Sequence, residues 1–109
     1  MIFTTYILRC SDHSYYTGHT DNFDVRMNQH QIATVGYVAE RRPFSVVWIG
    51  EFETRAEALA FELKVKGWSR AKKEALIAGD WNLVSKLAKS SKNRSDRRFD
   101  GLSSNGRKD

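Results

Sequence analysis

Glu62 is the most informative polar residue of this sequence, because it lies among the apolar positions of an amphipathic pattern over residues 58–65. Successive residues of a helix are about 100° apart, so Glu62 falls in the middle of an apolar arc that includes Leu59 and Leu63. A carboxylate rarely occupies such a position alone, since burying an unpaired charge is costly. Two kinds of partner fit: an ordinary ion pair with Lys66, or a metal ion or cationic cluster.

Arg26 and His30 are a second candidate pair. They lie four positions apart and so share one face of a predicted helix, next to the apolar Phe23 and Met27. An arginine offers a charged fork that matches a phosphate group, and a histidine can move a proton near neutral pH. The same spacing also suits an ordinary surface arginine with a flanking histidine, so the pair does not identify a site by itself.

Three tyrosines gather in a short predicted hairpin at residues 5–18: Tyr6, Tyr15 and Tyr16. Aromatic residues pack well on pleated strands, which is the ordinary explanation for them. If Tyr6 and Tyr16 serve one site, they must leave the same face of the sheet, as they do when Tyr16 pairs with Leu8. That register requires a loop of odd length, or a bulge, at the turn.

The elements that must position these residues follow from periodicity and capping residues. Strands are expected at 2–10, 14–19 and 44–52. Helices are expected over four ranges, each opened by a capping residue: 21–32 (Asp21), 54–66 (Thr54), 69–78 (Ser69) and 80–87 (Asp80). This order of elements predicts an α/β fold.

The composition fits one globular domain followed by a basic tail. The chain has 109 residues with 40% hydrophobic content, and residues 89–109 hold seven basic and three acidic residues, hence most of the net charge of +5. Because this segment lacks apolar periodicity, we expect a domain over 1–88 and a disordered basic tail over 89–109. The basic segment 64–73 is either a phosphate-facing patch or a solvated helix end.

Several classes of protein are disfavoured by the sequence. No run reaches the ~18 apolar residues of a membrane span, and the first residues lack the basic start and the cleavage site of a signal peptide. We therefore expect a cytoplasmic protein. The single cysteine, Cys10, excludes an intramolecular disulfide and a cysteine-rich zinc site.

Five segments together resemble the GIY-YIG nuclease domain, in particular the small stand-alone bacterial URI-domain endonucleases. The similarity covers about residues 3–80 and keeps the order of the family's motifs. The matching segments are "TYI" (5–7), "YTG" (16–18), "NFDVRMNQH" (22–30), "EALAFE" (57–62) and "SRAKKEALI" (69–77). The resemblance implies the fold of that domain, a small three-stranded antiparallel sheet flanked by helices.

The resemblance also implies which residues carry the chemistry. It assigns one Mg²⁺ or Mn²⁺ to Glu62, and catalytic roles to five further residues: Tyr6, Tyr16, His19, Arg26 and His30. In this assignment Tyr16 activates water, Tyr6 orients it, His30 assists proton transfer and Arg26 neutralises developing charge. His19 stands where some family members have a lysine, and Asn82 is the candidate for the family's asparagine.

The function implied is metal-assisted hydrolysis of phosphodiester bonds in nucleic acid, with DNA favoured over RNA. The alternative is a non-catalytic nucleic-acid-binding module on the same fold, which would use segment 64–73 and the tail. A protein-interaction domain is a third hypothesis and would require an exposed apolar patch. Only the nuclease needs a carboxylate in the middle of an apolar arc, so Glu62 favours it.

Overall fold

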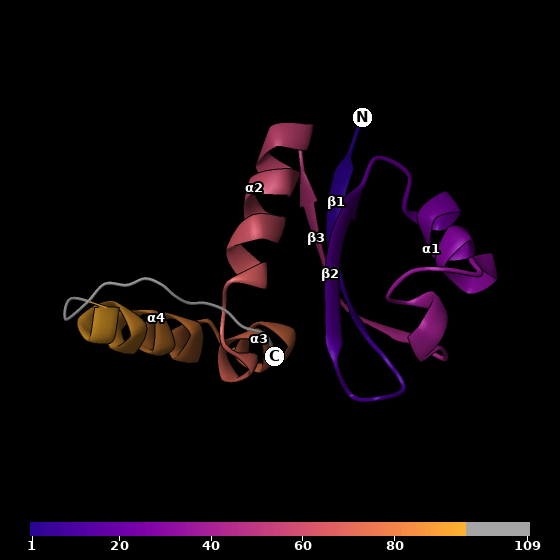
Figure 1. Cartoon of the computed structure of the whole chain (residues 1–109). Helices are drawn as coiled ribbons and strands as arrows, with labels where there is room; N and C mark the ends of the chain where they lie inside the picture. The colour runs from indigo at the N-terminus through magenta and orange to yellow at the C-terminus, as the bar shows by residue number, and fades with distance from the viewer. Residues whose placement is uncertain (96–109) are drawn as a thin grey trace. The chain divides into compact units, whose positions relative to one another are not determined.

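The computed structural model describes the backbone of residues 1–95 and the side chains of residues 1–88. The chain divides into a first compact unit, Met1–Leu63, and a second that begins at Lys64. Figure 1 shows the helices, which are α1 (Phe23–Ile32), α2 (Arg55–Lys66), α3 (Arg70–Ile77), α4 (Trp81–Ser95) and the short 3-10 helix η1 (Ala39–Arg41).

A three-stranded antiparallel sheet forms the centre of the first unit, as the resemblance implies. Its strands are β1 (Phe3–Arg9), β2 (Tyr15–Thr20) and β3 (Ser45–Phe52), in the order β2-β1-β3. Because β1 is the central strand, it is buried continuously from Thr4 to Leu8. The strand β2 lies at an edge, where residues from other elements can approach it.

The hairpin between β1 and β2 has the odd-length loop that the tyrosine spacing requires. The Cys10 amide donates to the Ser14 carbonyl over 2.9 Å, which leaves three residues in the loop. The last of them, His13, has φ of 70°, the left-handed conformation typical of a three-residue hairpin loop. Tyr16 consequently pairs with Leu8, so the predicted register is confirmed and both motif tyrosines leave the same face.

Different helices cover the two faces of the sheet. Tyr6 and Leu8 point to the α1 side, where they pack with Val38 in a small core. Thr5 points to the other side, as the alternation of a strand requires. Its hydroxyl donates a hydrogen bond of 2.7 Å to the carbonyl of Ala58 in α2. In Figure 1, α1 and the start of α2 accordingly flank the sheet on opposite sides.

The predicted cap of α1 is wrong by one residue. Asn22, not Asp21, is the N-cap, and its side chain accepts a hydrogen bond from a backbone amide of the first turn. The Asp21 carboxylate instead accepts a hydrogen bond of 2.8 Å from Arg55. Thr54 caps α2 as predicted, since its hydroxyl accepts from the amide three residues later.

The second unit is helical over its described residues. Ser69 caps α3, and Gly79, with φ of 75°, follows its C-terminus, both as predicted. Asp80 caps α4 as predicted, but α4 continues to Ser95 and not to about Leu87. No glycine or proline interrupts this extension, so nothing in the backbone ends the helix earlier.

The expected basic tail, 89–109, lies mostly outside the described residues, so its disorder stays a prediction. Over residues 1–95, the helices lack the combination of length and apolar content that a membrane crossing requires.

Gly18 makes room for the side chain of Tyr6. A Cβ at position 18 would lie 2.6 Å from the Tyr6 hydroxyl oxygen, closer than such atoms approach. We expect Gly18→Ala to displace this hydroxyl and to lower the free energy of unfolding by roughly 1–3 kcal/mol in chemical denaturation. The same change should cost less in a Tyr6→Leu background, where both the oxygen and the ring carbon 2.8 Å from that Cβ are gone. An equal cost in both backgrounds would contradict the contact.

Candidate active site

Tyr6 is the centre of a cluster of polar side chains in the first unit. Its side chain is fully buried, and its hydroxyl oxygen lies 2.9 Å from His30 Nε2 and 3.4 Å from Arg26 Nε. Both partners come from α1, where a spacing of four residues places them on the face toward the sheet. The structure therefore brings the predicted Arg26 and His30 pair to a predicted tyrosine.

Hydrogen-bond chemistry fixes the direction of these contacts. A guanidinium only donates, so Arg26 donates to the Tyr6 oxygen and the Tyr6 O–H is left to donate to His30 Nε2. Burial raises the pKa of Tyr6 to about 12, against the opposing effect of the Arg26 hydrogen bond. Burial, and then the Arg26 charge, lowers the pKa of His30. At neutral pH Tyr6 is thus a neutral phenol, and His30 is a neutral imidazole with its proton on Nδ1.

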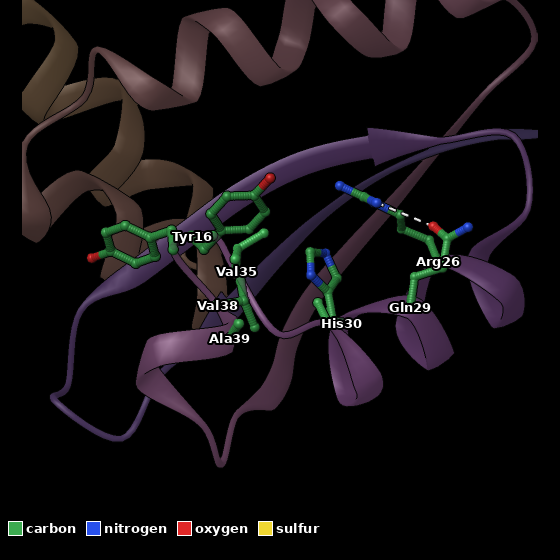
Figure 2. A pocket seen from close by; sticks show the side chains of 10 residues that line it. Tyr16, Arg26, Gln29, His30, Val35, Val38 and Ala39 are labelled. Carbon is green, nitrogen blue, oxygen red and sulfur yellow. Dashed lines mark hydrogen bonds between the residues drawn. The ribbon is translucent and has the colours of Figure 1, made fainter.

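Tyr16 joins this cluster from β2. Its ring centroid lies 6.3 Å from that of Tyr6 and 5.4 Å from that of His30. Tyr16, Arg26 and His30 line a pocket of about 190 Å³. Figure 2 shows Arg26 and His30 extending from their helix toward the sheet. The pKa of the Arg26 guanidinium is raised, first by its hydrogen bond to Tyr6 and also by the nearby Tyr16. The three groups are therefore coupled electrostatically.

Glu62 and His19 form a second, smaller group. The Glu62 carboxylate oxygen lies 2.6 Å from His19 Nδ1, and because a carboxylate only accepts, Nδ1 is the donor. His19 pairs with Thr5 in the sheet, so it leaves the α2 side and not the side that Tyr6 faces. His19 is therefore a hydrogen-bond partner of Glu62. The sequence indicated that Glu62 needs a partner, but it did not identify His19 as that partner.

Glu62 lies at the border of the buried face of α2, not in its middle as predicted. Ala58 and Val65 are fully buried, whereas Leu59 and Leu63 are 39% and 59% exposed. The buried arc of the helix is therefore narrower than its apolar arc, and it ends near Glu62. The border position explains how a 7% exposed carboxylate reaches a residue of the edge strand β2.

The two groups influence each other although they leave different sides of the sheet. Burial is the main cause of the raised pKa of Tyr6, and the negative charge of Glu62 adds to it. Tyr6 lies against Gly18, which has no side chain to hold the groups apart. The first unit therefore contains all six predicted site residues in two neighbouring groups, which are Tyr6, Tyr16, Arg26 and His30, and His19 with Glu62.

Glu62 is the member of this set that could hold a divalent cation. Within residues 1–95, no three His, Cys, Asp or Glu side chains converge as a closed metal site. Mg²⁺ commonly uses one or two carboxylates, while water and substrate phosphate oxygens complete its coordination. A single carboxylate oriented by His19 fits such an open site and does not fit a structural zinc site.

The predicted set lacks two polar side chains of the pocket, Gln29 and Tyr37. Gln29 Oε1 accepts a hydrogen bond of 3.1 Å from Arg26 Nη1, a contact that its i+3 position could have indicated. Tyr37 stacks on Tyr16 from the loop after α1, with ring centroids 5.9 Å apart. No periodicity links a loop residue to a site, so the sequence gave no signal for Tyr37. Asn82 is exposed on α4.

Comparison with known proteins agrees with this fold. The chain matches the sequence model of the GIY-YIG catalytic domain over residues 2–75. It is 38% identical over 87 residues to the UPF0213 protein BH0048 of Halalkalibacterium halodurans, covering 76% of this chain and 93% of that protein. It is 36% identical over 76 residues to the UPF0213 protein NP_0776A of Natronomonas pharaonis, covering 69% and 89%.

A solved structure supports the same conclusion. The solution NMR structure of the protein EF2693 from E. faecalis is similar with a TM-score of 0.53 and 32% identity, covering 72% of this chain and 85% of that one. The fold and these similarities thus define a small α/β domain with a nuclease-type fold. The chain belongs to the GIY-YIG catalytic domain family.

The lowered pKa of His30 predicts how stability depends on pH. Below about pH 6.5 the unfolded chain binds a proton at this histidine more readily than the folded protein does. His30 therefore contributes stability above that pH, and the contribution is lost as the pH falls toward the folded pKa. We expect melting temperatures of His30→Gln to fall less steeply from pH 7 to pH 5 than those of the parent. Replacing Gln31, an exposed residue of the same helix without a titratable group, by Ala should leave the slope unchanged; equal slopes for His30→Gln and the parent would refute the assignment.

Proposed function

We propose that this protein is a metal-dependent endonuclease that hydrolyses phosphodiester bonds in nucleic acid, with DNA favoured over RNA. The observation that supports this most directly is the environment of Arg26. Its side-chain partners are the Tyr6 hydroxyl, the Gln29 amide oxygen and the Tyr16 hydroxyl, none of them a carboxylate, and it lines an open pocket. A cation held by neutral acceptors keeps its charge for an anionic substrate, and phosphate matches the guanidinium fork.

Arg42 also has neutral acceptors, the carbonyls of His30 and Ala33, but it does not line the pocket. Three further arginines are held by acidic residues. Arg41, Arg55 and Arg70 each contact a carboxylate, at 3.1, 2.8 and 3.1 Å. Such pairs are solvated surface contacts of small energetic value, and their charges are already compensated. Arg26 combines the absence of a carboxylate partner with a place at the pocket, and this combination fits an external anion. During hydrolysis it would neutralise the charge that develops on the phosphoryl oxygens.

The phenols and the imidazole divide the handling of protons. Tyr6 stays protonated at neutral pH, so in this proposal it orients the attacking water and is not the base. Tyr16, which lines the pocket beside Arg26, would act in its deprotonated form and take the proton from water, which returns it to the phenol. His30 is neutral and accepts from Tyr6 at Nε2, so a proton that reaches the Tyr6 oxygen can pass on to His30.

Glu62 and His19 serve the metal in this proposal. Glu62 would hold one Mg²⁺ or Mn²⁺, which when bound supplies Lewis-acid polarisation of the phosphate and stabilises the leaving oxygen. His19 donates to the carboxylate and so fixes the orientation of its oxygens.

Glu62→Gln tests the metal-binding role without changing the shape of the side chain. The amide oxygen can still accept from His19, so we expect the free energy of unfolding to change by less than about 1 kcal/mol. Cleavage of labelled DNA and RNA substrates in Mg²⁺ or Mn²⁺ should fall by orders of magnitude while binding persists. Glu57→Gln, on the exposed first turn of the same helix, is the matched control and should cleave normally. Parental cleavage by purified Glu62→Gln would show that the metal site is misassigned.

Arg26→Ala tests the phosphate role separately. We expect loss of cleavage that added metal does not restore, because the missing charge stabilises the phosphoryl oxygens and does not bind the metal. Arg55→Ala, which removes a surface ion pair with Asp21, should keep parental activity. If no substrate of a panel of single-stranded, duplex and branched DNA and RNA is cut, but the panel is bound, the protein is the non-catalytic binding module instead.

A further inference from the structure

The pocket that contains Arg26 has a second wall, to which the proposed hydrolysis assigns no task. The loop after α1 forms this wall, and its lining residues are Ala33, Val35, Gly36, Tyr37, Val38 and Ala39. Arg26 and Gln29 stand at the other end, as Figure 2 shows. The pocket therefore joins a cationic, hydrogen-bonding side to an apolar side that contains the two stacked rings of Tyr16 and Tyr37.

Contacts from behind hold Tyr37 in place. The Arg41 guanidinium lies 3.8 Å from the centre of its ring, and Arg41 Nη1 donates to the Tyr37 carbonyl over 3.1 Å. Arg41 is itself anchored by a hydrogen bond of 3.1 Å from its Nε to Asp12. The next residue, Val38, is buried in the small core. A ring fixed in this way loses little conformational freedom when a ligand binds.

The wall is nevertheless open to solvent. Tyr37 remains 40% exposed, and Val35 is 79% exposed. Around Gly36, whose φ is 109°, the space that a Cβ would take is empty. Packing against Tyr16 therefore does not use all of the Tyr37 surface, and the loop adds apolar surface beside it.

We propose that this pocket receives an unstacked nucleobase next to the phosphate at Arg26, so that the favoured substrate contains unpaired nucleotides. This inference rests on the proposed function and names its substrate class. A planar base matches the aromatic and apolar wall, and stacking of this kind accepts any base. The Gln29 amide, whose oxygen faces Arg26, can donate from its nitrogen to a base edge. A base inside a regular duplex cannot enter without leaving its stack.

The test compares bases with bare backbone on the same protein. Binding is measured by fluorescence anisotropy without divalent metal, so that nothing is cleaved, on a labelled single strand of DNA, on its duplex, and on a strand of equal length with abasic sites throughout. We expect the intact strand to bind more tightly than the other two. Tyr37→Ala should weaken binding of the intact strand roughly 5- to 100-fold and leave the abasic strand unchanged, while Tyr37→Phe should bind like the parent.

A spectroscopic readout and a control complete the experiment. A 2-aminopurine base placed in turn at each position of the single strand should lose fluorescence at one position on binding the parent, and keep it with Tyr37→Ala. Trp81→Ala removes an aromatic residue that is 56% exposed and does not line the pocket. This control should change neither the affinity for the intact strand nor the affinity for the abasic strand.

The ratio of intact to abasic affinity decides the outcome even if Tyr37→Ala melts at a lower temperature, because both strands meet the same protein. If Tyr37→Ala weakens both strands equally, or neither, the inference is wrong. The endonuclease proposal is tested separately, by measuring cleavage and its dependence on Glu62 and Arg26.

Discussion

The buried hydroxyl of Tyr6 is the constraint on which the rest of the site depends. A hydroxyl removed from water is costly unless it both donates and accepts, and here His30 and Arg26 supply the two partners. Both must come from one helix face, which fixes how α1 lies on the sheet. The ring also needs space beside the edge strand, which only Gly18 can leave. One phenol in the central strand thus specifies a helix orientation, a glycine and the protonation states of its neighbours.

The hydrogen bond between His19 and Glu62 meets a different requirement. A nearly buried carboxylate at the border of α2 needs a donor, and the edge strand provides one from the side of the sheet opposite Tyr6. Gly18, which pairs with Tyr6 and directly precedes His19, has no side chain, so little bulk lies between the two groups at this edge. Burial is the main cause of the raised pKa of Tyr6, and the negative charge of Glu62 raises it further, as expected for a nearby carboxylate. Division of the site over both faces is therefore compatible with a single reaction centre.

Sequence reasoning succeeded where a rule is local. Tyr6 and Tyr16 both have even residue numbers, and side chains alternate between the two faces of a strand. A shared face for the two tyrosines therefore predicts the strand register and an odd loop length, which the structure confirms. It failed where burial depends on what covers an element. Helical periodicity put Leu59 and Leu63 in the buried arc of α2, but the periodicity of one helix does not tell how wide its partner is. Tyr37 was missed for a related reason, since a loop residue has no period.

The charge pattern explains why neutral partners surround the one arginine of the pocket. A carboxylate beside Arg26 would hold the guanidinium more strongly, but it would also repel a phosphate and compensate the charge that the phosphate must meet. A phenol held neutral by burial and an amide oxygen orient the same group without that loss. Burial of His30 likewise favours its uncharged form, so its Nε2 can accept the hydrogen bond from Tyr6 and it adds no second positive charge beside Arg26. The raised pKa of Tyr6 and the lowered pKa of His30 therefore serve one end, which is to leave Arg26 as the charge that the pocket presents.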